Sequence, residues 1–306
     1  MKNDALQKKI TELAFLAEET GIDISAEIGQ LENKIQETTQ IESAWKQVEL
    51  ARHHARPYSL DYINSIFDDF TELHGDRFFG DDPSIVGGLA FLNGRPVTII
   101  ANQKGRSVQD RVTRNGGMAN PEGYRKALRL AKQAEKFHRP IITFVDTPGA
   151  YPGMGAEERG IGESIAHNLR DFSQLETPVV CIIIGEGGSG GALGICVGDR
   201  IYMLENAICS VISPEGCASI LLRDVSRVRD AAAMLRISSA DLMAFKVIDG
   251  IIQEPPGGAH MDPAACAAAI KEVLVKEITE LQRCNGKMLV RYRNQKLRAI
   301  GLWHEE

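Results

Sequence analysis

A run of glycines in the middle of the chain is the sequence feature best suited to chemistry. Five glycines fall within Gly185–Gly191, directly after the apolar run Val179–Ile184 and before the small apolar segment Ala192–Val197. This order is typical of a buried strand that turns sharply into a short helix. Because the first N–H groups of a helix have no partner within it, such a turn can present amide donors to an anion or an oxyanion.

The same glycines also fit a dinucleotide-binding motif. Gly185–Gly190 matches G-x-G-x-x-G, and Glu205 lies about as far downstream as the acidic residue of such folds does. However, only Gly191–Arg200 separates the last glycine from the next apolar run, which is short for a crossover helix between parallel strands.

A serine hydrolase is a further alternative. Gly187–Gly191 matches G-x-S-x-G, and Asp249 and His260 follow Ser189 in the order that a catalytic triad of this type requires. The turn could instead be an oxyanion site without a side-chain nucleophile, or it could serve packing alone. The motif by itself does not decide among these four interpretations.

The neighbouring segments predict how the turn is positioned. Ile141–Val145 has the composition of a second buried strand and ends in the glycine-containing turn Asp146–Gly153, after which a helix is expected from Glu157 to Leu175. The repeated order of strand, glycine-rich turn and helix implies parallel strands whose turns lie at the same edge of a sheet. Upstream, Asn93-Gly94 between two apolar runs predicts a β-hairpin.

Two polar segments lie between the hairpin and the second strand. Lys104–Arg106 and Arg111–Asn120 are expected to form a long polar loop, and loops of this length tend to be functional or disordered. Glu122–Phe137 reads as a helix with five basic residues mostly on one side, for which a solvated face is favoured and contact with phosphates is the alternative. The basic helix near the C-terminus has no assigned role.

The remaining elements follow from periodicity and capping signals. Residues 3–52 predict two or three amphipathic helices interrupted at Gly21, and Asp262 is expected to cap an alanine-rich helix over 264–281. Further strands are expected at Ile201–Leu204, Ile208–Ile212 and Val247–Ile252, and further helices from Ser59, at Pro214–Leu222 and at Val228–Leu235.

The composition indicates a soluble globular protein. The 306 residues are 43% hydrophobic and 25% charged, with a formal net charge of -6, so nothing in the charge balance suggests nucleic acid or an anionic membrane as a partner. The N-terminus has no apolar signal segment, and we expect a cytoplasmic location. The six cysteines form no C-x-x-C pair, which favours buried free thiols and predicts no metal site.

Several longer motifs, taken in order, resemble a known family. RPYSLDYI (56–63), GMANPEGYRKALRL (117–130), DTPGAYPGMGAEERG (146–160), GEGGSGGALG (185–194) and SVISPEGCASIL (210–221) are similar to the α subunits of the carboxyltransferase of bacterial-type multisubunit acetyl-CoA carboxylase. The resemblance implies an α/β fold of the crotonase-like (ClpP/crotonase) type, a superhelix of ββα units. With a boundary at Arg56-Pro57, we expect an N-terminal helical arm over residues 1–55 and a crotonase-like carboxyltransferase domain over 56–306.

The resemblance further implies an enzyme that works with other chains. Its partner would be a zinc-ribbon β subunit, in an α2β2 assembly, and the zinc would belong to that subunit, since the C-x-x-C pairs of a ribbon are missing here. The reaction would move a carboxyl group from carboxybiotin, held on a separate biotin carboxyl carrier protein and charged by a separate biotin carboxylase, to acetyl-CoA, giving malonyl-CoA for fatty acid synthesis. A different acyl-CoA remains an alternative substrate.

The implied site consists of backbone groups. The amides of Gly190 and Gly191 would stabilise the biotin oxygen as negative charge develops on it, with support from Gly187 and Gly188. The turn Thr147–Gly153, with Gly149 and Ala150, would form a wall of the same site. Ser189 is then a turn residue and not a nucleophile.

Overall fold

The computed structural model describes residues 11, 13, 15 and 25–301 of the chain. Its backbone contacts divide the chain into two compact units, one formed by Met1–Gln47 with Pro214–Arg236 and the other by Val48–Ser213 with Ile237–Glu306. The expected boundary after residue 55 stays a prediction. In the described part of the chain, no helix is both long enough and apolar enough to cross a bilayer.

The first unit is helical in its described residues. α2 (Ser25–Ala51), whose last residues belong to the second unit, confirms the helix predicted there, and it carries half-buried Ile28, Leu31 and Ile35 at helical spacing; over its whole length the apolar residues do not gather on one face. The helices expected before Gly21 fall largely outside the described residues. Within the same unit, the Arg229 guanidinium lies 5.8 Å from the centre of the Trp45 ring. The remaining elements are α9 (Pro214–Cys217), a π-helix (Ala218–Leu222), a 3-10 turn (Val225–Arg227) and α10 (Val228–Leu235).

The described strands of the second unit form one eight-stranded sheet in the order β1-β2-β3-β4-β5-β6-β8, with β7 paired to β5. Pairing is antiparallel from β1 to β3 and parallel from β3 onward. The strands are β1 (Asp68–Glu72), β2 (Ile85–Leu92), β3 (Arg95–Asn102), β4 (Ile141–Thr147), β5 (Val179–Gly188), β6 (Arg200–Leu204), β7 (Ile208–Ser210) and β8 (Gly250–Ile252).

The predicted hairpin is confirmed. Leu92 pairs with Arg95, and Asn93 and Gly94 between them have φ of 50° and 75°. Two consecutive left-handed residues match the twist of the flanking strands, and asparagine followed by glycine adopts them at low cost.

β4 and β5 run side by side at the centre of the sheet. Ile141 pairs with Val179, every residue of β4 is buried, and β5 is buried from Val179 to Gly187. β5 is longer than the predicted run: its first half pairs with β6, while Glu186–Gly188 pairs with β7. The first three glycines of the run therefore lie within the strand, and the turn comes later than expected.

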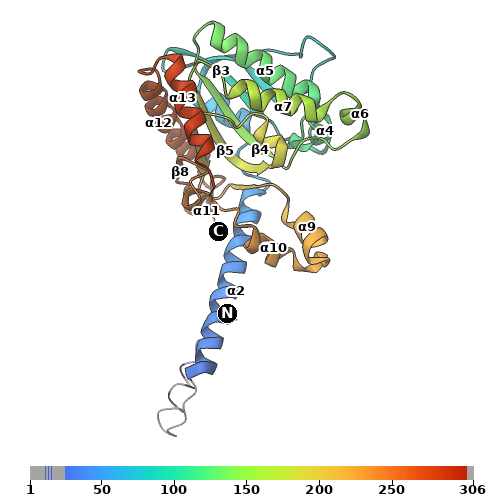
Figure 1. Ribbon diagram of the computed structural model, residues 1–306, viewed down its shortest axis with the longest axis vertical. Helices are drawn as coiled ribbons and strands as arrows, with labels where there is room; N and C mark the ends of the chain where they lie inside the picture. Colours follow the sequence, from blue (N-terminus) through green and yellow to red (C-terminus); the bar gives the residue numbers. More distant parts are fainter. Residues whose placement is uncertain (1–10, 12, 14, 16–24, 302–306) are drawn as a thin grey trace. The chain divides into compact units, whose positions relative to one another are not determined.

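Helices surround the sheet of the second unit (Figure 1). α5 packs on β2 and β3 and against α7, and α12 packs on β5 and β8 and against α3. Figure 1 shows α12 and α13 at one side of this unit and α4 and α6 at the other. The helices are α3 (Ser59–Ile66), α4 (Val108–Thr113), α5 (Pro121–Lys136), α6 (Met154–Glu158), α7 (Ile161–Phe172), α8 (Ser189–Leu193), α11 (Ser239–Ala244), α12 (Pro263–Leu281) and α13 (Gly286–Arg298).

Some predicted elements need correction. The single helix expected over Glu157–Leu175 is two helices, because Gly160 between α6 and α7 has a φ of 80° and ends the first. The predicted loop Arg111–Asn120 contains the end of α4 and a 3-10 turn over Asn115–Gly117.

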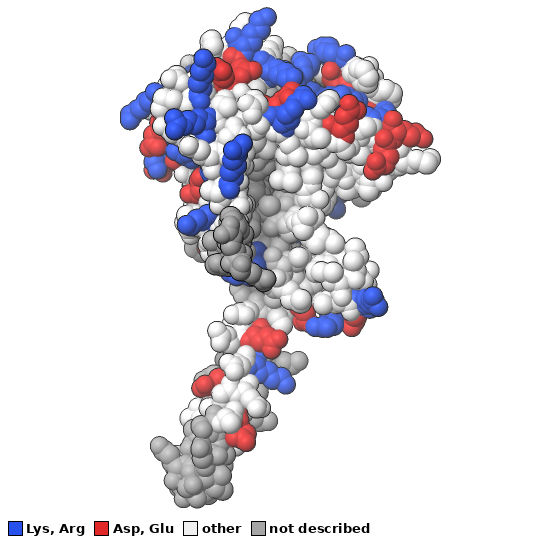
Figure 2. All heavy atoms as spheres, in the orientation of Figure 1, with Lys and Arg blue, Asp and Glu red and all other residues white. Residues whose placement is uncertain are grey.

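The basic face of α5 is engaged in intramolecular contacts. Arg125 Nε lies 2.8 Å from Asp76 Oδ2, and the fully buried Lys126 Nζ lies 2.6 Å from Asp81 Oδ1. Arg129 donates to the carbonyl oxygen of Gly75 at 3.0 Å. The solvated face expected for these residues is therefore wrong: they hold the segment before β2 on the helix. Elsewhere on the second unit both signs of charge are interspersed (Figure 2).

Candidate functional site

The two glycine-containing turns meet at the carboxyl ends of β4 and β5. Thr147 pairs with Gly187, so the residues that follow each strand leave the same edge of the sheet together. A β-carbon on Gly188 would collide with the carbonyl group of Pro148, and one on Gly191 would lie 2.6 Å from Ala150 N and closer still to Gly149. Glycine at these two positions lets the backbones touch. The structure thus brings Gly149, Ala150, Gly188 and Gly191 together.

Gly190 differs from its neighbours in the run. A β-carbon there would meet only Ile165, at an ordinary distance of 3.5 Å, and one on Gly149 would meet nothing within 4 Å. By contrast, a β-carbon on Gly187 would lie 3.0 Å from Cys209 Sγ. Packing within the chain therefore accounts for Gly187, Gly188 and Gly191, but it leaves space beside Gly190 and Gly149.

The serine hydrolase alternative does not assemble in the described residues. Ser189 is exposed and has a φ of 48°, a strained geometry that a nucleophile elbow would also show. Its supposed partners are engaged elsewhere. Asp249 Oδ2 accepts from Ile201 N at 2.7 Å and from Lys296 Nζ at 2.8 Å, and the His260 ring stacks on His53 at 3.9 Å. Nothing in these contacts forms a triad.

The dinucleotide alternative also lacks its architecture. α8 has five residues, and β5 lies between β4 and β6, its neighbours in sequence. Dinucleotides bind where the strand order of a doubly wound sheet reverses, and the described strands around β5 show no reversal. Glu205 accepts from the Glu254 amide at 3.2 Å.

A chain of buried and half-buried charges lies just before the two turns, and the sequence reasoning missed it. Lys104 Nζ lies 2.8 Å from Asp146 Oδ1 and 2.7 Å from Glu186 Oε2, and Arg52 Nε lies 2.7 Å from Glu186 Oε1. Asp146 Oδ1 also accepts from the Glu186 amide at 2.9 Å. One signal was present: Glu186 is a charged residue in a stretch that otherwise reads as a buried strand, and such a residue requires a partner.

Electrostatics keeps this chain ionised. Burial would raise the pKa of Glu186, but Lys104 and Arg52 outweigh burial and hold that pKa below its ordinary value. Burial would likewise lower the pKa of Lys104, but Asp146 and Glu186 outweigh it and raise the pKa above its ordinary value. Both groups are therefore charged at neutral pH.

A pocket of about 270 Å³ opens beside this charge chain. Arg52, Lys104 and Glu186 form part of its wall, together with Pro148 from the first turn. The other lining residues are Ala51, His53, Tyr58, Arg111 and Gly116. The pocket is thus polar, bears both signs of charge and lies next to the turn at Gly149.

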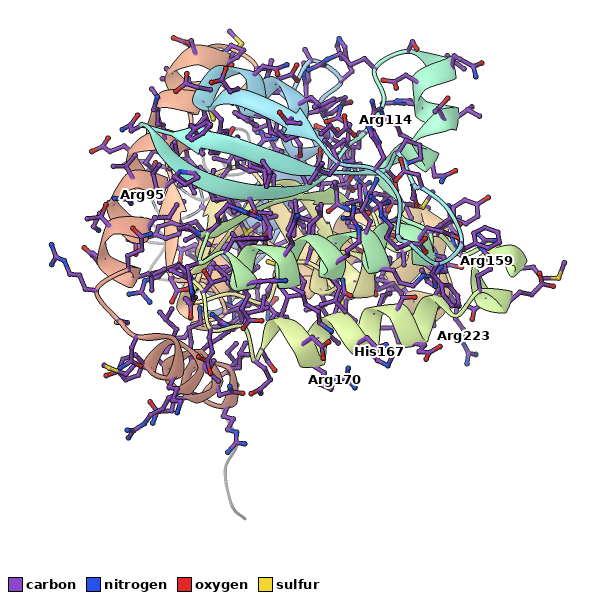
Figure 3. All side chains as sticks on the ribbon, turned by 90° about the horizontal axis from the view of Figure 1, so that it is seen from above. Arg95, Arg114, Arg159, His167, Arg170 and Arg223 are labelled. Atoms are coloured by element: carbon purple, nitrogen blue, oxygen red, sulfur yellow. The ribbon has the colours of Figure 1, made fainter. Side chains whose placement is uncertain are left out.

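The segment after the first turn is fixed by an arginine. Arg159 lies at the junction of α6 and α7 (Figure 3), where it donates to Glu122 and to Asn120 Oδ1 at 3.1 Å. Its guanidinium also lies 4.8 Å from the centre of the Phe79 ring. These contacts tie the segment to the start of α5.

The cysteines are free thiols, as expected, and four of them are buried. Cys209 Sγ packs against the backbone of Gly187. Burial raises the pKa of the Cys209 thiol to about 11, so this cysteine is not a reactive thiolate at neutral pH. Among the described residues, no group of three or more His, Cys, Asp or Glu side chains is arranged to hold a metal ion.

Comparison with solved structures supports the fold. The transcarboxylase 12S structure aligns with a TM-score of 0.59 and 24% identity over 73% of this chain, although this covers only 42% of that longer chain. A Pseudomonas malonate decarboxylase hetero-tetramer, in complex with coenzyme A, aligns with a TM-score of 0.59 and 17% identity over 72% of this chain and 89% of that chain. These likenesses confirm the crotonase-like α/β fold.

Comparison of sequences identifies the family. The model of the acetyl co-enzyme A carboxylase carboxyltransferase-like family matches residues 2–301. A Treponema denticola protein named acetyl-coenzyme A carboxylase carboxyl transferase subunit alpha is 62% identical, covering 100% of both chains. A protein of the same name from Staphylococcus carnosus is 51% identical, covering 98% of this chain and 97% of its own. The chain therefore belongs to the acetyl-CoA carboxylase carboxyltransferase family, as a relative of its α subunits.

Proposed function

We propose that this chain is the α subunit of an acetyl-CoA carboxylase carboxyltransferase, which transfers the carboxyl group of carboxybiotin to acetyl-CoA and gives malonyl-CoA. The observation that carries the assignment to this site is the space beside Gly190. Among the described residues, a β-carbon on Gly190 would meet Ile165 at an ordinary distance, so packing does not require a glycine there, whereas an external group that must approach the backbone closely does. The family membership supplies the reaction.

The backbone around Gly190 fits a ligand that bears a developing negative charge. Carboxybiotin would supply an activated carboxyl group when bound, and the backbone here would hold the ureido oxygen on which negative charge would develop. The amides of Gly190 and Gly191, at the start of α8, are the donors we assign to this oxygen, with Gly187 and Gly188 supporting the turn. Gly149 and Ala150 form the opposite wall. None of these roles requires a protein nucleophile.

The chain's own residues act by orientation and by shaping the site. The contact of Gly188 and Gly191 with residues 148–150 fixes the two turns relative to each other, so the donors are in place before charge develops. Preorganised donors of this kind stabilise the transition state more than the bound ground state. Ser189 sets the turn through its left-handed backbone.

We further propose the partners of the reaction. The thioester oxygen needs donors of its own, and we assign them to a zinc-ribbon β subunit in an α2β2 assembly. A biotin carboxyl carrier protein would deliver the carboxyl group, and a separate biotin carboxylase would load it. A coenzyme A thioester is the acceptor, and the cytoplasm is the location we assign.

Co-expression with a β subunit tests this function. The purified complex is expected to transfer the carboxyl group between malonyl-CoA and free biotin, whereas the isolated chain is expected to be inactive because it lacks the second set of donors. Rapid transfer by the monodisperse isolated chain would overturn the split site. A complex that assembles but transfers to neither acetyl-CoA nor propionyl-CoA would overturn the assignment as a carboxyltransferase.

A further inference from the structure

The charge chain beneath the turns joins four segments that are distant in sequence. Arg52 directly follows α2, Lys104 follows β3, Asp146 lies near the end of β4 and Glu186 lies near the end of β5. Lys104 lies on neither strand but contacts a side chain of each, Asp146 of β4 at 2.8 Å and Glu186 of β5 at 2.7 Å. Its ammonium group therefore bridges the ends of β4 and β5.

Both carboxylates lie where an unpaired charge is costly. Asp146 is 1% exposed and Glu186 is 8% exposed. The two residues are also linked directly, because the Glu186 amide donates to Asp146 Oδ1, the same oxygen that contacts Lys104. If the lysine were removed, two nearly buried like charges would face each other, an arrangement that favours uptake of a proton by one of them.

Displacement at these carboxylates reaches the turns directly. Asp146 is two residues before Pro148, and Glu186 is two residues before Gly188, whose backbones touch. A β-carbon on Gly185 would collide with the Asp146 carboxylate, so that side chain also fills the space between the strands. Close-packed interiors transmit such shifts instead of absorbing them.

We propose that Lys104 is a positioning residue, which holds the two turns at their working separation by neutralising Asp146 and Glu186. This role rests on the proposed function, because the turns matter to catalysis only if their backbone groups serve the transferred carboxyl group. Lys104 acts through the carboxylates and is not assigned a contact with substrate.

Other charged groups around the chain do not replace Lys104. Arg52 contacts Glu186 Oε1, the carboxylate oxygen that Lys104 does not contact. Arg56 is close enough to Asp146 to interact with its charge, but it is paired with Glu254. His53, Tyr58 and Arg111 line the adjoining pocket. Burial and the neighbouring His260, His54 and Arg56 lower the pKa of His53, so it is neutral at pH 7 and above.

The test uses the complex of the full chain with its β subunit and compares Lys104→Met with wild type between about pH 6 and about pH 8.5. At the alkaline end, kcat of the variant is expected to fall by about tenfold or more, with KM nearly unchanged, because both carboxylates are charged and repel. The ratio of variant to wild-type kcat should rise as pH falls, since one carboxylate takes up a proton. Taking this ratio cancels the titration of His53.

Two further variants separate charge from shape. Lys104→Arg keeps a cation and should retain most activity without the new pH dependence. Lys104→Met combined with Asp146→Asn removes one carboxylate together with the lysine, so it should recover part of kcat and make the ratio flat. Lys126→Met, which removes a buried lysine on α5, is the matched control and should show a flat ratio.

Each outcome decides the proposal. A flat ratio for Lys104→Met, or a raised KM with normal kcat, would overturn it, as would the same pH recovery in Lys126→Met. If Lys104→Met fails to assemble, the double variant decides: assembly with a flat ratio supports the proposal, and failure to assemble overturns it. A wild-type complex without any transfer would instead overturn the proposed function.

Discussion

The two ends of β5 each carry a buried ion cluster, but the clusters differ in how their charges are satisfied. At the amino end, Arg293 contacts Asp199 Oδ2 at 2.7 Å and donates to the carbonyl oxygens of Phe172 and Leu175 at 2.7 and 2.9 Å. Asp199 in turn accepts from the Val179 amide at 2.8 Å. One cation and one carboxylate are thus surrounded by backbone groups, and both side chains are almost fully buried.

At the carboxyl end, the cluster of Arg52, Glu186, Lys104 and Asp146 alternates charges instead, and three of its members line an open pocket. The amino-end cluster ties elements together, because Arg293 donates to backbone carbonyl groups as well as to Asp199, although both residues also line a pocket of about 450 Å³. In the carboxyl-end cluster each charge depends on a charged neighbour instead, so loss of Lys104 would leave Asp146 without its ion-pair partner and Glu186 with Arg52 alone. We therefore expect substitutions at the amino end to act mainly on stability, and substitutions at the carboxyl end to act mainly on the rate of transfer.

The largest expected effect is at the amino end. Arg293→Met would leave Asp199 buried without its partner and should lower the free energy of unfolding by about 3–5 kcal/mol. Urea unfolding monitored by circular dichroism measures this change, with the exposed Arg291→Met as control. Transfer per mole of folded complex should stay near wild type. A large loss of kcat in the folded fraction would erase the contrast between the two ends.

Removal of an amide at the carboxyl end should act on rate. Gly190→Pro deletes the N–H that we assign to the biotin oxygen, which should cost about 3–4 kcal/mol in the transition state, on the order of a hundred- to a thousand-fold in kcat. The backbone of Gly190 does not have a left-handed φ, so it is compatible in sign with the negative φ that the proline ring imposes.

Gly190→Ala is the matched control for this prediction, because it also fills the space beside the backbone but keeps the donor. It should raise KM for biotin more than it lowers kcat. Size-exclusion chromatography must show intact complexes for both variants. An assembled Gly190→Pro complex with nearly normal kcat would eliminate this amide as a donor.

Gly191→Ala tests the contact between the turns. A β-carbon there would lie 2.6 Å from Ala150 N, so the turns must separate, and overpacking of this kind costs about 1–3 kcal/mol. We expect Gly191→Ala to have a lower melting temperature than Gly190→Ala, measured by thermal unfolding. We also expect it to assemble less well with the β subunit, measured by size-exclusion chromatography. Equal stability of the two variants would show that the turns are not held in contact.

The smallest expected effect is at Ser189. Ser189→Ala should leave kcat within a few-fold of wild type, since the turn supplies backbone donors and the hydroxyl has no triad partners near it. The steady-state rate of transfer measures this. Covalent labelling of Ser189 by a fluorophosphonate probe, with complete loss of activity in the variant, would restore the hydrolase interpretation.

Local signals in the sequence predicted local structure well. Asp262 caps α12 through its side chain, which accepts from Ala265 N at 2.9 Å, and Asn93-Gly94 forms the hairpin turn. Both features depend on a few consecutive residues, so periodicity and turn chemistry were sufficient. The strand predicted over Val247–Ile252 is confirmed only over Gly250–Ile252, because only these residues pair with β6. An apolar sequence does not reveal where pairing with a neighbouring strand begins.

Contacts between distant segments were beyond this reasoning. The Ser107 side chain accepts from Asp110 N and begins α4, a capping signal that was present but lay inside a segment interpreted as loop. Arg52 and Lys104 meet Glu186 across 134 and 82 residues, and no spacing rule connects them. The site's glycines were predicted as a group, but which of them serve packing depends on where Pro148 and Gly149 lie.

The contact of Gly188 and Gly191 with the opposite turn has a consequence for inhibitors. A methyl group is the smallest side chain that mutation can add, and at either position it would collide with the main chain of residues 148–150. If a compound bound only to these main-chain atoms, no substitution at Gly188 or Gly191 could weaken its binding without also disturbing the contact between the turns. Drug resistance would have to arise at bordering side chains such as Ile165, which lies beside Gly190.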